Sequence, residues 1–227
     1  MKVKLISCSR PTHEVAMELR STMPLDLVAF CARVSNPSNQ LNTDTAEKLI
    51  KYLINNSHWS PLEMVHATLE IETTRDIARQ ILRHRSFSFQ EFSQRYAVAD
   101  LGQDIREARL QDTKNRQNSI EIDIADDEHR RIAYQWENIQ KNVINSTNQA
   151  YEWAIEHGIA KEQARAVLPE GITGSRMYMN GTLRSWVHYI QLRSANGTQK
   201  EHMDVALACA DAIKPIFPMI EEYTNGQ

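Results

Sequence analysis

The chain has 227 residues, of which 41% are hydrophobic and 24% charged, with only 7 Gly and 7 Pro. This composition is typical of a globular protein, and the length suits one α/β domain spanning residues 1–227, although length alone also allows two domains. The formal net charge of −3 argues against a protein that binds nucleic acid through a broad basic surface.

The first half of the chain alternates between strand and helix patterns. Residues 1–9 predict a first strand, and residues 43–56 predict an amphipathic helix. Apolar and polar residues then alternate over 65–71, which is typical of a half-buried strand. A threonine at position 73 or 74 caps a helix that we expect to reach about residue 84, where an ordered loop follows.

The second half is predominantly helical. Residues 98–125 are polar and lack periodicity, so we interpret them as a surface excursion or lid. A long helix is predicted over 126–157, ended by Gly158, and two further helices over 182–193 and 200–214. We find no internal repeat and no low-complexity linker, which favours a single domain.

The three cysteines, Cys8, Cys31 and Cys209, are widely spaced and odd in number. They form neither a disulfide framework nor a zinc motif, so we expect reduced thiols in a cytoplasmic protein. No apolar run is long enough for a signal peptide or a membrane span, and no membrane contact is expected. The absence of HExxH and of closely spaced His/Cys sets predicts no catalytic metal.

Residues 83–95 concentrate positive charge around one acid. Arg83, Arg85 and Arg95 surround Glu91, with serines at positions 86, 88 and 93. Guanidinium groups and hydroxyls suit phosphate, so the segment predicts a phosphate-bearing ligand. Because the chain lacks GxGxxG and Walker-type glycine loops, side chains must hold that phosphate. Gln80, one helical turn earlier, shares the same face.

Simpler explanations exist for several arginines. Arg165 and Arg193 lie at helix C-termini, where the helix dipole favours a cation without any ligand. Arg75 and Arg79 could pair with neighbouring acids on the surface. Their candidate partners are Asp76, Glu70 and Glu72. The Arg/Phe-rich segment 83–95 could also bind a nucleic acid by phosphate contact and base stacking, but the net charge argues against this.

The segment 83–95 has the form RHR, seven residues, then Ser-x-Arg, and it resembles the signature of the flavin-dependent thymidylate synthases. Five other stretches resemble that family in the same order, so the likeness extends over about residues 25–215. They are Cys-Ala-Arg-Val-Ser at 31–35, His-Trp-Ser-Pro at 58–61, Ala-Arg-Gln-Ile-Leu-Arg-His-Arg at 78–85, Ala-Arg-Ala-Val-Leu-Pro at 164–169 and Leu-Arg-Ser at 192–194.

The resemblance implies a single domain with a mainly antiparallel sheet flanked by helices. It implies conversion of dUMP to dTMP, with methylenetetrahydrofolate as carbon donor, FAD as hydride carrier and NADPH as reductant. It further implies that no enzyme nucleophile attacks the uracil ring, because in that family the flavin carries the redox step and the protein supplies position and electrostatics. The family resemblance also implies a homotetramer with active sites shared between subunits.

Site residues follow by position in the matching motifs. Arg193 is implied as the catalytic cation that stabilises negative charge on uracil. The implied dUMP contacts are Gln80, Arg83, Glu91, Ser93, Gln94, Arg95, Arg165 and Arg193. The implied FAD contacts are His58, Ser60, Arg83, His84, Arg85, Glu91, Thr182, Arg184 and His188.

The sequence departs from the family pattern at three positions. Gln90 stands where the signature often has Asn, and Thr182 and His188 stand where some relatives carry Asn near the flavin. A degenerate member that binds flavin without turnover is a further alternative. Retention of Arg83 and Arg193 among the other matched residues argues against it.

Overall fold

A four-stranded antiparallel sheet in the order β1-β2-β6-β3 forms the middle of the computed structural model, which describes residues 1–100 and 102–224. This arrangement confirms the predicted α/β fold with a mainly antiparallel sheet. The strands are β1 (Lys2–Cys8), β2 (His66–Thr74), β6 (Gly174–Thr182) and β3 (Ser88–Glu91).

The two central strands pair along their whole length, from His66 opposite Thr182 to Thr74 opposite Gly174. Alternate residues of both strands, such as Leu69 and Met179, are fully buried on one face. The opposite face carries polar cross-strand pairs. Among them, Tyr178 Oη donates to Glu70 Oε2 at 2.8 Å, and Arg176 Nε donates to Glu72 Oε1 at 2.9 Å.

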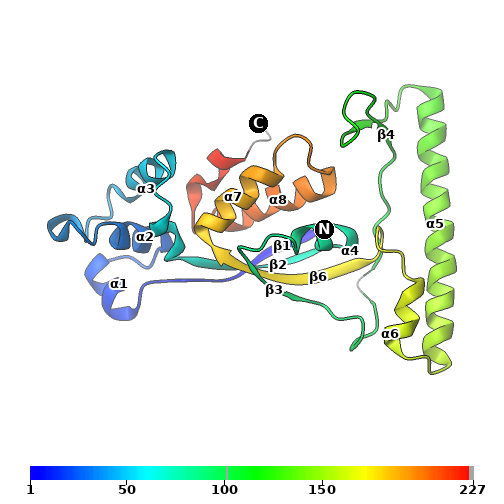
Figure 1. Ribbon diagram of the computed structural model, residues 1–227, viewed down its shortest axis with the longest axis horizontal. Coiled ribbons are helices and arrows are strands. Elements are labelled where there is room, and N and C mark those ends of the chain that lie inside the picture. The colour runs from blue at the N-terminus through cyan, green and yellow to red at the C-terminus, as the bar shows by residue number, and fades with distance from the viewer. Residues whose placement is uncertain (101, 225–227) are drawn as a thin grey trace.

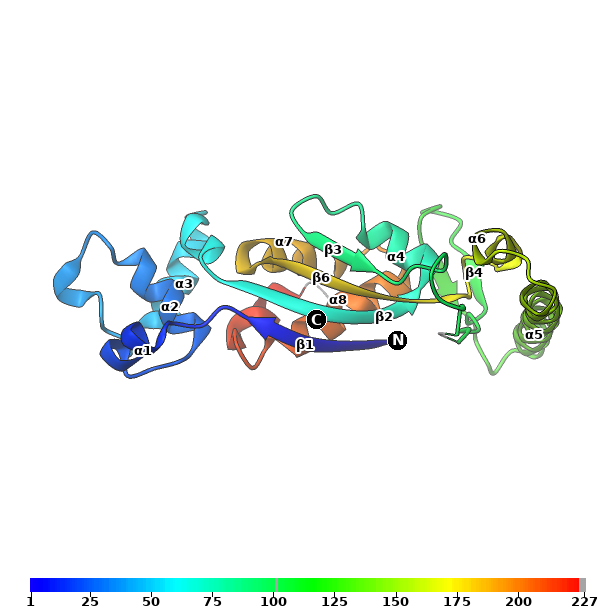
Figure 2. The same cartoon turned by 90° about the horizontal axis from the view of Figure 1, so that it is seen from below.

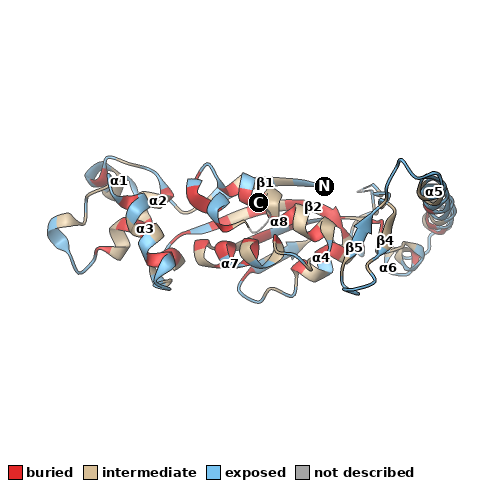
Figure 3. Cartoon of the chain, turned by 90° about the horizontal axis from the view of Figure 1, so that it is seen from above, coloured by how far each residue is buried: buried red, intermediate tan, exposed pale blue. Residues whose placement is uncertain are grey.

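Three helices cover the apolar face of the sheet: α4 (Arg75–Ile81), α7 (Leu183–Arg193) and α8 (Lys200–Ile213) (Figures 1 and 2). Trp186 of α7 is fully buried, and its indole Nε1 donates to the Ala67 carbonyl oxygen of β2 at 3.1 Å. Buried residues concentrate in this layer, as Figure 3 shows, so the main core lies between the sheet and these helices. The short helix η4 (Pro218–Tyr223) adds to it.

Helices from the N-terminal quarter gather at one end of the sheet (Figure 1). They are α1 (His13–Leu19), α2 (Pro24–Ala32), η1 (Pro37–Asn39), α3 (Ala46–Asn55) and η2 (Ser60–Glu63). The predicted helix over 43–56 is therefore present but begins three residues later. Its buried residues, among them Ile50 and Leu53, lie on the predicted apolar face.

A long helix stands at the other end of the molecule (Figure 1). This helix, α5 (Asp127–Glu156), begins where predicted, because the Asp126 carboxylate accepts from the His129 amide at 2.9 Å. It ends before Gly158, whose φ of 72° lies in the left-handed region. A small second core of Tyr151, Ala154 and Ala164 joins it to α6 (Lys161–Ala164), and η3 (Arg165–Val167) follows α6 directly. The exposed apolar residues of α5 are Tyr134, Trp136, Ile139, Val143 and Trp153.

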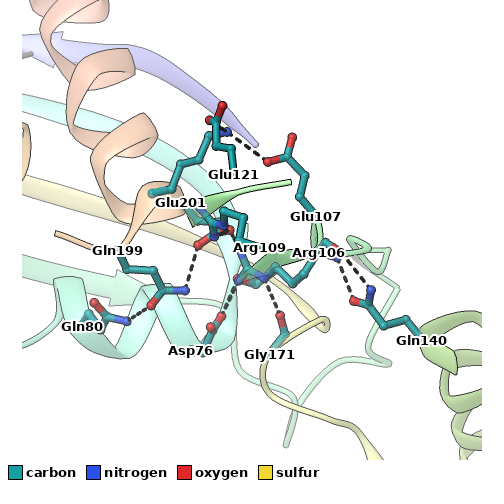
Figure 4. Close-up of polar contacts among 12 residues, drawn as sticks. Asp76, Gln80, Arg106, Glu107, Arg109, Glu121, Gln140, Gly171, Gln199 and Glu201 are labelled. Atoms are coloured by element: carbon teal, nitrogen blue, oxygen red, sulfur yellow. Dashed lines mark hydrogen bonds and ion pairs between the residues drawn. The ribbon is translucent and has the colours of Figure 1, made fainter. Parts of the chain in front are cut away.

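The described residues of the polar segment, 98–100 and 102–125, run over the surface as predicted, and they include the hairpin β4 (Arg109–Gln111) and β5 (Ser119–Glu121). They are anchored rather than free. The Arg106 guanidinium bonds Asp76 of α4 at 2.9 Å, and Arg109 forms an ion pair with Glu201 of α8 (Figure 4). These contacts fix the excursion against the helical layer. Separately, no helix in residues 1–100 or 102–224 combines the length and apolar character needed to cross a bilayer.

Candidate active site

The segment that carries Arg83, His84 and Arg85 is fixed between α4 and the sheet. The ring of Phe87 is buried and lies 4.8 Å from the Trp186 ring, in an edge-on arrangement. Residues 88–91 then pair with β6 as strand β3, where we predicted a loop. The sequence of this short edge strand has no strong strand pattern. Its stability comes from pairing with β6.

Arg193 and His84 meet at the adjoining ends of α7 and α4. Arg193 Nε donates to His84 Nε2 at 2.9 Å. Burial, together with the charges of Arg193 and Arg83, lowers the pKa of His84 to about 4. The imidazole is therefore neutral at pH 7, with its proton on Nδ1. Because the partner is uncharged, this contact leaves the positive charge of Arg193 uncompensated and available to an anion.

Gln80 joins this group through two residues that the sequence analysis missed. Its side-chain Oε1 lies 3.2 Å from Nδ1 of His202, a fully buried residue of α8. His202 Nε2 in turn lies 3.2 Å from the Tyr189 hydroxyl, and the Tyr189 ring contacts His84 edge-on at 4.9 Å. The one available signal in the sequence is a histidine at an inward position of the predicted helix 200–214, which is usually read as a core residue.

A second group of predicted residues gathers beside α6. Arg95 Nη2 lies 3.4 Å from Glu162 Oε2, and Arg165 Nε donates to the Glu162 carbonyl oxygen at 3.3 Å. Directly before Arg95 in the chain, Gln94 is buried, and its amide Nε2 has no hydrogen-bond partner within the described part of the chain. Ser93, partly buried, precedes it. An unpaired buried donor next in the chain to Arg95, whose guanidinium shares Glu162 with Arg165, suits an anionic ligand.

Glu91 lies between this second group and α4. Its Oε1 accepts from the Ser175 hydroxyl at 2.8 Å and lies 3.8 Å from Arg75 Nη1. Arg79 pairs with Glu170 at 2.5 Å. Arg75 and Arg79 therefore pair with acids, as the simpler explanation predicted, but these acids are Glu91 and Glu170. The expected acids are engaged elsewhere: Asp76 with Arg106, Glu70 with Tyr178 and Glu72 with Arg176.

A third group lies where the start of α7 meets η2. The His188 ring packs against the Trp59 ring at a centroid distance of 4.3 Å, and Arg184 forms an ion pair with Glu63. Burial lowers the pKa of His188, and the Arg184 charge adds to this. Thr182 caps α7, since its hydroxyl oxygen accepts from the Ser185 amide at 3.1 Å.

The remaining predicted flavin residues are exposed. His58 and Ser60 lie at η2, and Arg83 and Arg85 lie at the end of α4. Exposed guanidinium groups together with the Trp59 and His188 rings fit an aromatic cofactor that carries phosphates, so the donor set is compatible with FAD. Among residues 1–100 and 102–224, no group of three or more His, Cys, Asp or Glu side chains is placed to hold a metal ion.

These three groups place arginine, amide and hydroxyl side chains of the kind that suits phosphate-bearing aromatic ligands around an antiparallel sheet. A sequence profile of the family described as "Thymidylate synthase complementing protein" matches residues 18–219. The chain is 46% identical over 220 residues to a probable flavin-dependent thymidylate synthase of Paramecium bursaria Chlorella virus 1, covering 97% of each chain. It is 47% identical over 221 residues to the flavin-dependent thymidylate synthase of Synechocystis sp., again covering 97% of each.

The chain therefore belongs to the family of flavin-dependent thymidylate synthases. Its fold is similar to the crystal structure of the UMP/dUMP methylase PolB from Streptomyces cacaoi bound with 5-Br UMP. That comparison has a TM-score of 0.76 and 25% sequence identity, and it covers 98% of this chain and 92% of the other.

Proposed function

We propose that this enzyme makes dTMP by reductive methylation of dUMP, with methylenetetrahydrofolate as carbon donor, FAD as hydride carrier and NADPH as reductant. Membership of the family supports the reaction. The observation that carries the proposal in this chain is the Arg193 guanidinium hydrogen-bonded to a neutral His84. A fixed cation whose partner is uncharged can stabilise the negative charge that develops on an activated uracil ring.

We assign dUMP to the first two groups. In the first, Arg193 acts on the uracil ring, and Gln80 and Arg83 supply further donors. In the second, the donors that suit the phosphate and sugar are Ser93, Gln94, Arg95 and Arg165, with Glu91 beside them. The unpaired Gln94 amide is an observation that favours a ligand here, because a buried donor without a partner is costly.

We assign FAD to the triplet Arg83, His84 and Arg85 and to the third group. Arg83 and Arg85 supply positive charge, and His84 holds its Nδ1 proton as a donor. The other proposed contacts are His58, Ser60, Glu91, Thr182, Arg184 and His188. When bound, the flavin supplies hydride transfer, which amino-acid side chains cannot perform.

The cysteines take no part in this mechanism. Burial raises the pKa of the Cys209 thiol far above neutrality, so it stays protonated within the core. Burial also raises the pKa of Cys31, which lies in α2 at the end of the molecule away from α4. Activation of uracil therefore rests on the Arg193 charge, with position supplied by the side chains around it.

We further propose a homotetramer in which neighbouring chains complete each active site. The exposed aromatic and aliphatic side chains of α5 favour burial against a partner. The two proposed dUMP groups also rest on different supports, one on α4, α7 and α8 and the other on α6. A single domain over residues 1–227 and a cytoplasmic location complete the proposal.

The function is tested with purified protein reconstituted with FAD under anaerobic conditions. We expect NADPH to bleach the flavin absorbance, faster when dUMP is present, and dTMP to form only when methylenetetrahydrofolate is added. Arg130→Ala is the matched control variant for site arginines, because Arg130 is exposed on α5 and pairs with Asp127. Absence of dTMP from a protein that binds and reduces FAD would contradict the proposed reaction.

The shared site is tested by mixing two inactive variants, Arg193→Ala and Arg165→Ala. If a site takes these residues from different chains, some sites in a mixed tetramer contain both arginines. We expect activity to reappear after the subunits are mixed and allowed to exchange. A monomer by light scattering, or no recovery after proven exchange, would contradict shared sites.

A further inference from the structure

His202 lies under the first group of site residues, on the face of α8 that packs toward α7 and α4. It is 0% exposed, which is unusual for a histidine. Its two ring nitrogens each face one polar atom: Nδ1 lies 3.2 Å from Gln80 Oε1, and Nε2 lies 3.2 Å from the Tyr189 hydroxyl. A buried imidazole with both nitrogens engaged is held in one orientation.

The hydrogen bonds continue from Gln80 to the surface of the molecule (Figure 4). Gln80 Nε2 donates to Gln199 Oε1 at 2.8 Å, and Gln199 Nε2 donates to Glu201 Oε2 at 2.9 Å. The other carboxylate oxygen of Glu201 pairs with Arg109 and lies 3.6 Å from Arg106. This hydrogen-bonded series therefore runs from the Glu201 carboxylate through Gln199, Gln80 and His202 to the buried Tyr189.

The charge of Glu201 fixes the direction of every bond in this series. Burial would raise the pKa of Glu201, but hydrogen bonds and the two arginines outweigh it and lower the pKa, so the group is ionised and can only accept. Gln199 must then turn its NH₂ toward Glu201 and its oxygen toward Gln80. Gln80 in turn must point its NH₂ at Gln199 and its oxygen at His202.

The same reasoning sets the tautomer of His202. Because Gln80 Oε1 can only accept, His202 Nδ1 must carry the proton, and Nε2 then accepts from the Tyr189 O–H. Burial, with the charges of Arg193 and Arg83 and the neighbouring His84, lowers the pKa of His202 to about 3, so this neutral form holds at pH 7. Reversing the amide of Gln80 would place its NH₂ against the Nδ1 proton.

We propose that His202 is a positioning residue that, together with Gln199, holds the orientation of the Gln80 amide and so decides which donor Gln80 offers to the nucleotide. With Oε1 held by His202 and one N–H held by Gln199, the second N–H of Gln80 is the donor left for a ligand. This inference rests on the proposed function, in which Gln80 contacts dUMP. This positioning role does not require His202 or Tyr189 to contact the substrate.

The test measures dUMP binding to the FAD-loaded enzyme by calorimetry, together with KM and kcat. His202→Leu removes both hydrogen bonds, whereas His202→Asn keeps an amide donor in the place of Nδ1. We expect His202→Leu to raise the Kd and KM for dUMP about tenfold, with kcat at saturating dUMP within about threefold of wild type. His202→Asn should stay within about threefold of wild type on every constant.

Two further variants separate positioning from loss of packing. Cys209→Ala alters a fully buried residue on the same helix outside the hydrogen-bond series, and it should leave the Kd for dUMP unchanged. Gln199→Met breaks the series at an exposed residue, so it should fold even if His202→Leu does not. We expect it to raise the Kd for dUMP several-fold, and combining it with His202→Leu should add little, because both act through one amide.

The outcomes are distinct. An unchanged Kd in His202→Leu and Gln199→Met, or equal losses in His202→Leu, His202→Asn and Cys209→Ala, would overturn the positioning role while the proposed function stands. A wild-type enzyme that holds FAD but binds no dUMP would overturn the proposed function and this inference with it.

Discussion

The ring of Phe87 lies so close to the backbone of Gly181 that a Cβ at position 181 would fall 2.4 Å from Phe87 Cδ1. Gly181 belongs to β6, and Phe87 belongs to the turn that joins the RHR triplet to β3. The missing side chain of Gly181 therefore makes room for the ring that anchors the triplet.

Replacing Gly181 with Ala should displace Phe87 and with it the triplet. We expect a loss of about 1–3 kcal/mol in the free energy of unfolding, as for other overpacked cores. FAD affinity should fall as well, measured by flavin fluorescence. Gly171→Ala is the matched control, because a Cβ there meets nothing within 4 Å. A Gly181→Ala enzyme with wild-type stability and FAD affinity would contradict this account.

Arg193→Ala should abolish turnover while leaving much of the flavin bound. Removing a charge aimed at the developing anion typically costs about 10²- to 10³-fold in kcat. Steady-state dTMP formation and the flavin-to-protein ratio measure the two effects. Arg193→Lys should recover part of the rate through its charge. Near-normal kcat in Arg193→Ala would reject the catalytic assignment.

Arg83→Ala should weaken FAD retention, because Arg83 is exposed beside His84 and supplies charge to the proposed cofactor site. Loss of one charge-assisted contact predicts about a tenfold rise in the Kd for FAD, measured by titration of the apoenzyme. Arg79→Ala serves as the control, since Arg79 is also exposed but pairs with Glu170. Equal effects of the two substitutions would count against a specific contact.

Turnover should survive removal of each thiol. Cys8→Ser and Cys31→Ser should keep kcat within about twofold of wild type, because neither thiol acts as a nucleophile in the proposed mechanism. Cys209→Ala should lower the free energy of unfolding by about 1 kcal/mol, because it leaves a small cavity, but it should keep kcat. A dTMP assay on the three variants decides the matter, and loss of turnover in a folded variant would favour covalent catalysis.

Stability should fall as the pH is lowered from 6.5 toward 4. The pKa of His84 is lowered to about 4 and that of His202 to about 3, from 6.5. In this window the unfolded chain binds protons that the folded chain does not, so the free energy of unfolding decreases. Allowing for solvent screening at the half-buried His84, we expect roughly 2–4 kcal/mol from both imidazoles together.

Urea unfolding at several pH values measures how steeply the free energy of unfolding changes with pH, which is the slope compared between variants below. His202→Asn should make the slope shallower, because it removes one of the two titrating groups. A wild-type protein whose stability is flat between pH 6.5 and 4 would show that neither imidazole is held neutral by the fold.

The elements that sequence patterns predict well here are those with local signals. The long helix α5 has Asp126 before it and Gly158 after it, and both positions act as the pattern indicates. Strand β6 went unpredicted, because glycine, asparagine and methionine have little strand preference of their own. Its stability comes from pairing with β2 on one side and β3 on the other, which no local window contains.

The residues of the candidate site likewise divide into those with a local sequence signal and those without one. The arginines of 83–95 attract notice because charge is concentrated within thirteen residues. The contact between His84 and Arg193 was not predicted and appears only in the structure. His202 and Tyr189 carry no comparable local signal, since their roles depend on contacts between α4, α7 and α8. Gln80 and His202 are 122 positions apart, so only the folded arrangement brings their side chains together.

The pairing of β2 with β6 also governs the order in which the molecule can fold. Asn180 Nδ2 donates to Thr68 Oγ1 across 112 positions of the chain, and β1 and β3 flank this central pair. Such distant pairing makes folding slow, because closing a long loop costs entropy before contacts compensate for it. Until β6 docks, Phe87 has no Gly181 to pack against. A growing chain therefore carries its arginine triplet long before it has a site, and the site forms only once α7 and α8 have followed β6 out of the ribosome.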